Sequence, residues 1–190
     1  AAVEKVQAAC AIELAKAEPV LEAARLALEN IEKGQLTELK SFASPPETVK
    51  FVMNMVVVLF KWVDEGRIIP ESQRTWTEAK NTIGPVEKFL QRLKNFQVAK
   101  VTSQVRAIID KLNTTLMKIS KTDSIESLIQ QIALKSAAAG GIYTWLDNTL
   151  KFHTVYLEVK PKQVALDVAN EELNRAQQAF SKILNRVQIL

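Results

Sequence analysis

The two ends of this 190-residue chain repeat apolar residues at alternating spacings of three and four. Near the start, the two series are Val3, Cys10, Ala17, Ala24 and Ile31, and Gln7, Leu14, Leu21 and Leu28. Near the end, they are Leu166, Leu173, Phe180 and Val187, and Ala169, Ala176, Ile183 and Leu190. Such a spacing, held over four heptads, is typical of coiled-coil helices. Each end therefore predicts a helical arm of about 30 residues, or roughly 45 Å.

The arms can pair with each other only if the chain runs out, turns and runs back. The simplest fold is all-α: an antiparallel coiled-coil hairpin, made of residues 1–32 and 158–190, capped by a small globular bundle of short helices in residues 33–157. Two alternatives remain open, namely the arms of an ordinary helical bundle, and a scaffold or adaptor that dimerises through its heptads. Pro19 and Pro161, one in each arm, predict kinks where the coil meets the tip domain.

The middle of the chain carries several helix start and stop signals. In the stretch SPPE, Ser44 is the expected N-cap, Pro45 the first helical residue and Glu47 the third residue of a capping box. This signal precedes an apolar helix expected over about 46–61. With 5 Gly and 6 Pro in 190 residues, the composition favours helix throughout, and we see no strand pattern.

Further signals divide the rest of the middle. Thr75 opens a second capping box, and Gly84 ends the helix that follows it. A third capping signature at 123–126 predicts a helix continuing to Ala139, with Gly140 and Gly141 loosening the chain before a final long helix. Gly34 is expected to end or loosen the first arm.

The residues needed for most catalysis are missing. Cys10 is the only cysteine and His153 the only histidine, so no His-Cys-carboxylate metal cluster can form. Ser136 and Asp147 are near each other in sequence, but nothing else supports a triad, and there is no phosphate-binding loop. The longest apolar run, 51–60, is about half of a membrane span. We therefore expect a soluble, intracellular binding segment that is not an enzyme and needs no metal or cofactor.

Positive charge is concentrated in the middle of the chain. Residues 33–157 hold 17 Lys and Arg against 11 Asp and Glu, a net charge of +6, whereas residues 1–32 carry −3 and residues 158–190 carry +1. This distribution suits an acidic partner. Nucleic acid, anionic lipid and an acidic protein surface all qualify, although the few aromatic residues form no stacking platform for single strands.

Four stretches together resemble dynein heavy chains, in the order found in that family. The stretch ELKSFASPPETVK at 38–50 is similar to the segment after the outgoing stalk helix, and KSAAAGG at 135–141, followed by Trp145, to the motif before the returning helix. The stretch VKPK at 159–162 resembles the returning helix, and Pro19 stands where the outgoing helix has a proline. The stretches GRIIP at 66–70 and WTEAK at 76–80 resemble axonemal heavy chains.

Two stretches depart from the family pattern. Ile142 and Tyr143 stand where the family commonly has Leu-Cys. KTDSI at 121–125 replaces an Asn-Pro-x-Phe stretch, which affects the expected contacts of the 120–130 loop but not the fold.

The resemblance implies a microtubule-binding domain that docks on α- and β-tubulin, in the axoneme of a cilium or flagellum. It implies no nucleic-acid or membrane partner, a monomeric segment, and a parent motor ATPase that is part of a multi-subunit complex. Three short helices, at 33–42, 76–83 and 124–139, would face the microtubule. The residues expected to contact tubulin are Lys33, Lys40, Lys80 and Lys135, followed by Arg74 and Lys88.

The resemblance also implies a way of controlling affinity. ATP turnover in a distant ring would slide the two stalk helices past each other, and Pro19 and Pro161 would lie at the junction where sliding becomes tilting of the first short helix. The small residues Ala17 and Ala24 in the first arm fit this expectation, because they fix the pairing register only weakly.

Overall fold

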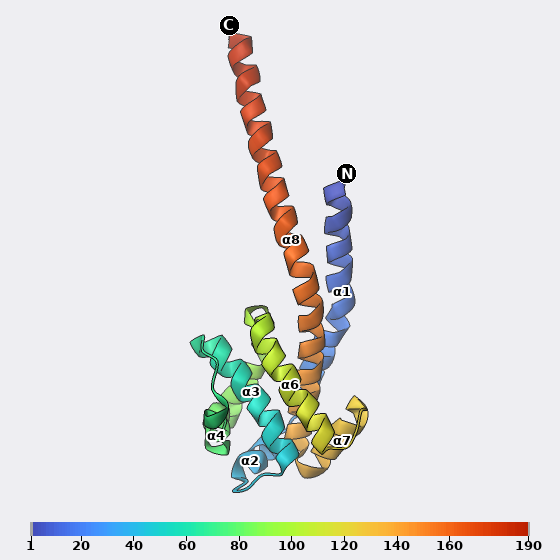
Figure 1. Cartoon of the computed structure of the whole chain (residues 1–190), viewed down its shortest axis with the longest axis vertical. Helices are drawn as coiled ribbons and strands as arrows, with labels where there is room; N and C mark the ends of the chain where they lie inside the picture. The colour runs from blue at the N-terminus through green and yellow to red at the C-terminus, as the bar shows by residue number, and fades with distance from the viewer. Residues whose placement is uncertain (1, 190) are drawn as a thin grey trace. The chain divides into compact units, whose positions relative to one another are not determined.

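The computed structural model describes residues 2–189, and all regular elements within them are helical, which confirms the all-α prediction (Figure 1). The elements are α1 (Ala2–Glu29), α2 (Lys33–Ser41), α3 (Glu47–Glu65), η1 (Glu71–Gln73), α4 (Trp76–Ile83), α5 (Val86–Lys94), η2 (Val98–Lys100), α6 (Ser103–Ile119), α7 (Ile125–Lys135) and α8 (Ala137–Ile189). The heptad residue Leu190 and the side chain of the heptad residue Val3 lie outside the described part of the chain.

The contacts divide the chain into two compact units. One unit, the arm unit, combines the chain up to Glu18 with the chain from Thr154 onward, and the other, the tip unit, is Pro19–His153. The domain limits predicted from the sequence, 1–32, 33–157 and 158–190, differ from the limits of these two units and stay a prediction. In this division the first-arm residues after Glu18 pack as part of the tip unit.

In the arm unit, the first part of α1 lies beside α8 and runs antiparallel to it (Figure 1). Cys10, Val159 and Leu166 form its buried cluster, and Leu14 and Val155 pack against them. The predicted pairing of the two arms is therefore present here.

The later heptads of the second arm are not packed within the described residues. Leu173, Phe180, Ile183 and Val187 are 54, 62, 58 and 65% exposed. Because the α1 part of this unit is shorter than the α8 part, the C-terminal part of α8 has no helix of the described chain beside it (Figure 1).

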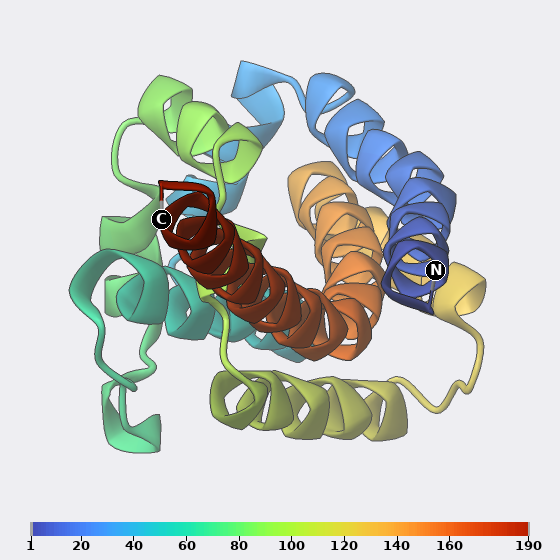
Figure 2. The same cartoon turned by 90° about the horizontal axis from the view of Figure 1, so that it is seen from above.

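The core of the tip unit is built around α3. Its buried residues are Val49, Val52, Met53, Met55, Val56, Val57, Val58, Leu59 and Phe60. A helix that is apolar on nearly every side is stable only when other elements surround it. The helix α6 packs along it (Figures 1 and 2), and α4 and α7 also contact it. Ala24, Leu28 and Ile31 continue the first heptad series into this core rather than into a coiled coil.

The predicted start of α3 is wrong by two residues. The helix begins at Glu47, its N-cap is Pro46, and no side chain caps it. A proline disfavours the helical conformation in the residue before it, so Pro46 prevents Pro45 from being the first helical residue. Pro45 is instead buried in the turn between α2 and α3.

Two other caps agree more closely with the sequence. Thr75 accepts a hydrogen bond from the backbone N–H of Glu78 at 3.1 Å, which confirms the predicted N-cap of α4. At α7 the predicted signature is one residue off, because Ser124 accepts a hydrogen bond from the N–H of Ser127 at 3.3 Å.

The predicted roles of the glycines at 34, 140 and 141 are wrong. Gly34 lies inside α2, since the first arm ends earlier, at Glu29. The break between α7 and α8 is at the buried Ser136, whose hydroxyl accepts a hydrogen bond from the N–H of Ala139 at 3.1 Å, and Gly140 and Gly141 lie inside α8. An N-cap of this kind starts a helix without any glycine.

Candidate functional site

The first turns of α8 bring together two of the short helices expected to face the partner. A Cβ atom on Gly140 would lie 2.8 Å from Cβ of Ala133, near the end of α7, and one on Gly141 would lie 2.7 Å from Cγ1 of Ile31, just before α2. Only residues without a side chain allow both approaches. The start of α2 and the end of α7, which carry Lys33 and Lys135, are therefore held near the same segment of α8.

Lys40 is tied to another helix of the tip unit. Its ammonium nitrogen Nζ donates a hydrogen bond to the carbonyl oxygen of Gly84 at 2.8 Å, in a partly buried position. Gly84 is the C-cap of α4, where the carbonyls carry a partial negative charge that a cation stabilises. Nearby, the indole N–H of Trp76 donates to the carbonyl oxygen of Phe42 at 2.8 Å. Both contacts fasten α2 to α4, so Lys40 has a structural role.

The other predicted residues differ in their contacts. Lys33 forms an exposed ion pair with Glu87 of α5 at 3.1 Å. The guanidinium Nε of Arg74 donates to the carbonyl oxygen of Ile69 at 3.2 Å.

Lys80, Lys88 and Lys135 form no ion pair within residues 2–189. Lys80 on α4 is half-buried, and Lys88 on α5 and Lys135 on α7 are exposed. Of the six predicted residues, these three lysines have neither an ion pair nor a side-chain hydrogen bond within residues 2–189, whereas Lys33 pairs with a carboxylate and Lys40 and Arg74 donate to backbone carbonyls.

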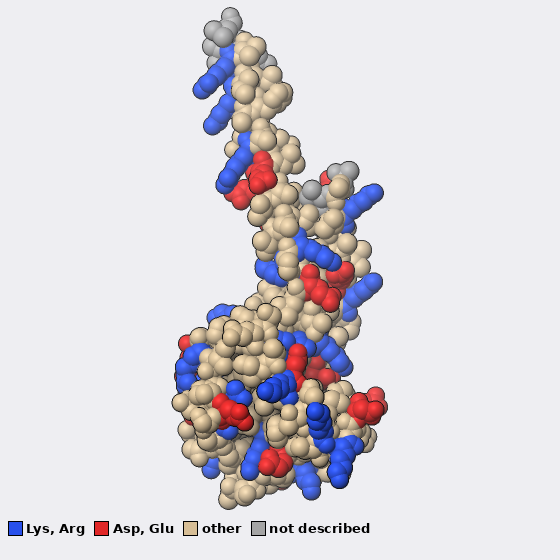
Figure 3. Space-filling view, viewed as in Figure 1, with Lys and Arg blue, Asp and Glu red and all other residues tan. Residues whose placement is uncertain are grey.

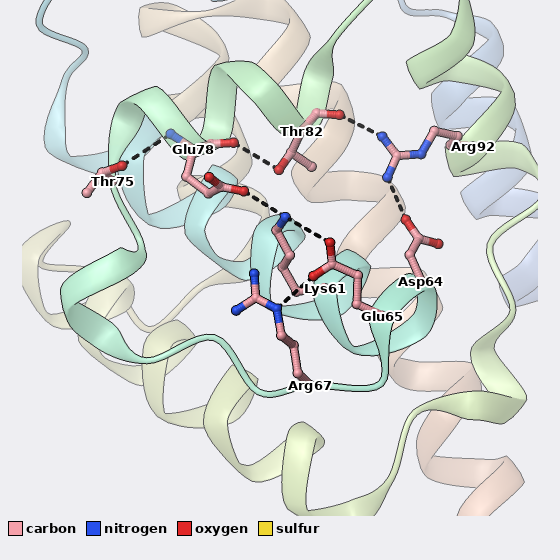
Figure 4. A network of polar contacts seen from close by, with 8 residues as sticks. All are labelled: Lys61, Asp64, Glu65, Arg67, Thr75, Glu78, Thr82 and Arg92. Carbon is pink, nitrogen blue, oxygen red and sulfur yellow. Dashed lines mark hydrogen bonds and ion pairs between the residues drawn. The ribbon is translucent and has the colours of Figure 1, made fainter.

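Several other cations of the tip unit are matched by carboxylates in a network that joins α3, α4 and α5 (Figure 4). Lys61 contacts Glu78 at 2.8 Å and Glu65 at 3.4 Å, and Arg67 contacts Glu65 at 2.7 Å. The hydrogen bond that Lys61 donates to Glu78 is the main cause of a raised pKa at Lys61, and the hydrogen bond that Glu65 accepts from Arg67 is the main cause of a lowered pKa at Glu65. The charges of Lys61 and Arg67 are therefore matched by carboxylates of the tip unit itself.

Arg92 extends this network to α5. It contacts Asp64 at 2.7 Å and donates to the carbonyl oxygen of Thr82 at 2.7 Å (Figure 4). Its guanidinium carbon also lies 4.6 Å from the centre of the Phe60 ring, within the range of a cation–π contact. The network positions α4, and the positive charge left for a partner belongs to other residues.

An exposed leucine on α7 was not predicted. Leu134 is 86% exposed, directly before Lys135. The buried side of α7 is marked by Leu128 and Ile132, four residues apart. Leu134 is two residues beyond Ile132 and so points away from that side, at about 200° around a helix of 3.6 residues per turn. This mismatch with the apolar stripe was a signal that the sequence already contained.

The surface of the tip unit carries basic side chains around its lower end, interrupted by a few acidic ones (Figure 3). In the part of the chain that the structure describes, no three His, Cys, Asp or Glu side chains are placed to hold a metal ion. No helix among the same residues combines the length and apolarity of a membrane span.

Comparisons with known proteins show which family the chain belongs to. A family model described as the microtubule-binding stalk of dynein motor matches residues 1–190. The chain is 40% identical over 165 residues to a ciliary dynein beta chain of Heliocidaris crassispina, covering 86% of this chain and 3% of that protein. It is 38% identical over 174 residues to human dynein axonemal heavy chain 17, covering 90% and 4%, and 33% identical over 169 residues to the flagellar outer-arm dynein alpha chain of Chlamydomonas reinhardtii, covering 88% and 3%.

The chain thus spans only 3 to 4% of the length of these relatives, but the matches cover most of the chain itself. The sequence resemblance to dynein heavy chains, including the axonemal type, is confirmed. The chain belongs to the family of microtubule-binding stalks of dynein motors.

Proposed function

We propose that the tip unit binds the acidic surface of α- and β-tubulin through α2, α4 and α7, and that α7 contributes the central contact. The observation that carries this proposal is the exposed pair Leu134 and Lys135 at the end of α7. Lys135 has no ion-pair partner within residues 2–189, and Leu134 is 86% exposed beside it. An exposed apolar side chain next to an unmatched cation suits an interface with an apolar centre and an acidic surround.

The other predicted contact residues then have different roles. Lys80 and Lys88 add unmatched positive charge from α4 and α5. Lys33 has to leave Glu87 to reach a partner, since the two form an ion pair. Lys40 and Arg74 each donate to a backbone carbonyl, so they act by holding α2 and the loop before α4 in place.

Microtubule co-pelleting of the whole chain tests this proposal. Lys135→Gln removes one exposed charge contact and is expected to weaken binding by up to about fivefold, the upper range for exposed ion pairs. Leu134→Ser removes an apolar contact and is expected to weaken binding about tenfold, or about 1.4 kcal/mol.

Salt separates the two contributions. Raising the ionic strength from about 0.05 to 0.2 M shortens the range of charge interactions, so the effect of Lys135→Gln shrinks while that of Leu134→Ser persists. Lys182→Gln is the matched control, because Lys182 is an exposed lysine of α8 in the arm unit. The proposal fails if Lys182→Gln weakens binding as much as Lys135→Gln, or if Leu134→Ser has no effect.

We infer that sliding of the two arms controls this affinity, with Pro19 and Pro161 at the junction, in response to ATP turnover elsewhere in a parent motor. The parent would be an axonemal heavy chain within a multi-subunit complex, in a cilium or flagellum, as the relatives' names suggest. In support, Pro19 is the first residue of the tip unit along the chain, and Pro161 lies in the arm unit a few residues after Thr154. Ala17, a buried position of α1 in the arm unit, is small, and such a residue resists an axial shift weakly; Ala24 packs in the core of the tip unit instead.

Cys10 provides a direct test of sliding. It shares a buried cluster with Val159 and Leu166 of α8, so Val159→Cys and Leu166→Cys each bring a second thiol into that cluster. A disulfide formed in either variant would hold Cys10 opposite a different residue. The two locked forms are expected to differ in microtubule affinity, and reduction is expected to remove the difference. Equal affinities in both oxidised forms would refute control by sliding.

A further inference from the structure

A groove in the tip unit lies on elements other than α2, α4 and α7. It has a volume of about 640 Å³ and lies between α1, the segment from the end of α5 through η2, and α8. Its apolar lining includes Leu21, Leu28, Leu93, Phe96, Trp145 and Phe152. This volume and this lining are typical of sites for small molecules, which commonly occupy about 300–1,000 Å³.

The walls of the groove are held by core packing. Leu28, Leu93 and Trp145 are buried residues of the tip core, and the rings of Phe96 and Trp145 meet edge to face with their centres 5.4 Å apart. Phe96 also stacks on Phe60, with ring centres 5.7 Å apart. The groove is therefore a formed feature of the fold, and a ligand would not have to order it on binding.

One polar group inside the groove lacks a partner. Thr149 lines the groove and is only 3% exposed, yet its hydroxyl has no hydrogen-bond partner among the described residues. The hydroxyls of Thr48 and Ser120 are fully shielded from solvent and have no hydrogen-bond partner within the described residues. The Thr149 hydroxyl differs from them, because its oxygen keeps a small accessible area. A hydroxyl in such a place is available to hydrogen-bond a molecule that enters the groove.

The charged groups beside the groove are cationic. Lys94 and Lys100 line it, are exposed, and form no ion pair within residues 2–189. Arg25 lines it too, but its charge is matched by Glu22 and Glu29 on the same helix. Two unmatched ammonium groups beside an apolar surface attract an anion that also has an apolar body.

We propose that this groove binds a small amphipathic carboxylate. The apolar body packs on Phe96 and Trp145, the carboxylate accepts hydrogen bonds from Lys94 and Lys100, and the Thr149 hydroxyl donates to an oxygen of the ligand. The occupant is a small molecule with an apolar chain or ring system. The groove shares no lining residue with the proposed microtubule contacts, so this proposal and the proposed function can fail independently.

Calorimetric titration of the whole chain with decanoate tests the proposal, with decan-1-ol as the uncharged counterpart of equal chain length. Decanoate is expected to bind at least tenfold more tightly than decan-1-ol. The double variant Lys94→Gln/Lys100→Gln should remove most of that difference. Thr149→Val, which keeps the side-chain shape, should weaken decanoate binding by about fivefold, the scale of one hydrogen bond. Ala99→Trp places a large ring at an exposed lining position and should block both ligands.

Lys111→Gln is the matched control, because Lys111 is an exposed lysine of α6 that does not line the groove and has no part in the proposed microtubule contacts. It should leave decanoate binding unchanged. Circular dichroism melting of each variant establishes that it is folded before titration. The proposal is overturned if decanoate does not bind, if it binds no better than decan-1-ol, or if the three groove variants bind it as the unchanged chain does.

Discussion

Replacing Gly140 by alanine tests whether close packing between α7 and α8 positions the proposed contact helix. The added Cβ would lie 2.8 Å from Cβ, 3.0 Å from Cα and 3.2 Å from the backbone nitrogen of Ala133. Carbon atoms pack best at about 3.5–4.0 Å. Two of the three atoms belong to the backbone, so no side-chain rotation relieves the contact, and α7 must move away from α8 by roughly 1 Å.

The expected magnitude has two parts. Overpacking of this kind costs about 1–3 kcal/mol of the free energy of unfolding. Against it, alanine is about 1 kcal/mol better than glycine inside a helix. The net effect of Gly140→Ala is therefore a loss of stability of up to about 2 kcal/mol.

Gly34→Ala is the matched control. Gly34 also lies inside a helix, α2, and a Cβ added there meets nothing within 4 Å. It should gain about 0.5–1 kcal/mol of stability, because only the propensity applies. The difference between the two variants isolates the packing cost of about 1–3 kcal/mol, which corresponds to a difference in Tm of about 2–12 °C for a chain of this size.

Thermal unfolding followed by circular dichroism measures both variants, and microtubule co-pelleting shows whether a shift of α7 changes affinity. We expect Gly140→Ala to melt below Gly34→Ala and to bind microtubules more weakly, because Lys135 moves with α7. If Gly140→Ala melts at the same temperature as Gly34→Ala, the close approach does not constrain the two helices and the reasoning is refuted.

Two further predictions concern polar contacts of the tip unit. His153 is buried, its Nε2 lies 2.7 Å from the carbonyl oxygen of Val101, and its Nδ1 lies 3.1 Å from a guanidinium nitrogen of Arg106, an arrangement that holds the ring neutral. Burial is the main cause that lowers the pKa of His153 in the folded chain, and the nearby Arg106 lowers it further. The contribution of neutral His153 to stability is therefore complete above the unfolded pKa of about 6.5, and it is lost as the pH falls through the lower pKa of the folded chain. The Tm should drop between pH 7.5 and 5.5 and this drop should be smaller in His153→Gln; a Tm that is unchanged or rises on acidification would contradict the assignment, since the chain has no other histidine. Lys40→Gln should lower the Tm by a few degrees, because it removes the contact with the Gly84 carbonyl, whereas Lys135→Gln should leave the Tm unchanged; equal melting of the two variants would show that Lys40 is not a structural residue.

The sequence determined the class of fold because helix signals are local. The heptad spacing, the N-cap at Thr75 and the stop at Gly84 depend on neighbouring residues. The structure confirms the cap and the stop of α4, and it pairs the two arms around Cys10, Val159 and Leu166. The double proline was correctly read as a break, since it removes backbone donors and restricts the preceding residue. Its exact N-cap was misplaced because the two prolines constrain each other.

The sequence alone left the glycine positions ambiguous. Gly140 and Gly141 loosen a helix if nothing else is near, and permit close packing if another element is. Only the positions of Ala133 and Ile31 decide between these cases. The break was instead made at Ser136, whose buried hydroxyl caps α8.

The tertiary structure also decided the roles of the lysines. Lys40 and Lys135 look alike in sequence, each at the end of a short helix. Lys40 contacts a carbonyl 44 residues away in the chain, and Lys135 has no such contact. Whether a charge is free for a partner depends on contacts between distant residues, whereas the sequence shows directly only that the charge exists. The sequence thus determined the helices, the family and the basic character of the tip unit, and the three-dimensional packing decided which of its side chains remain available for binding.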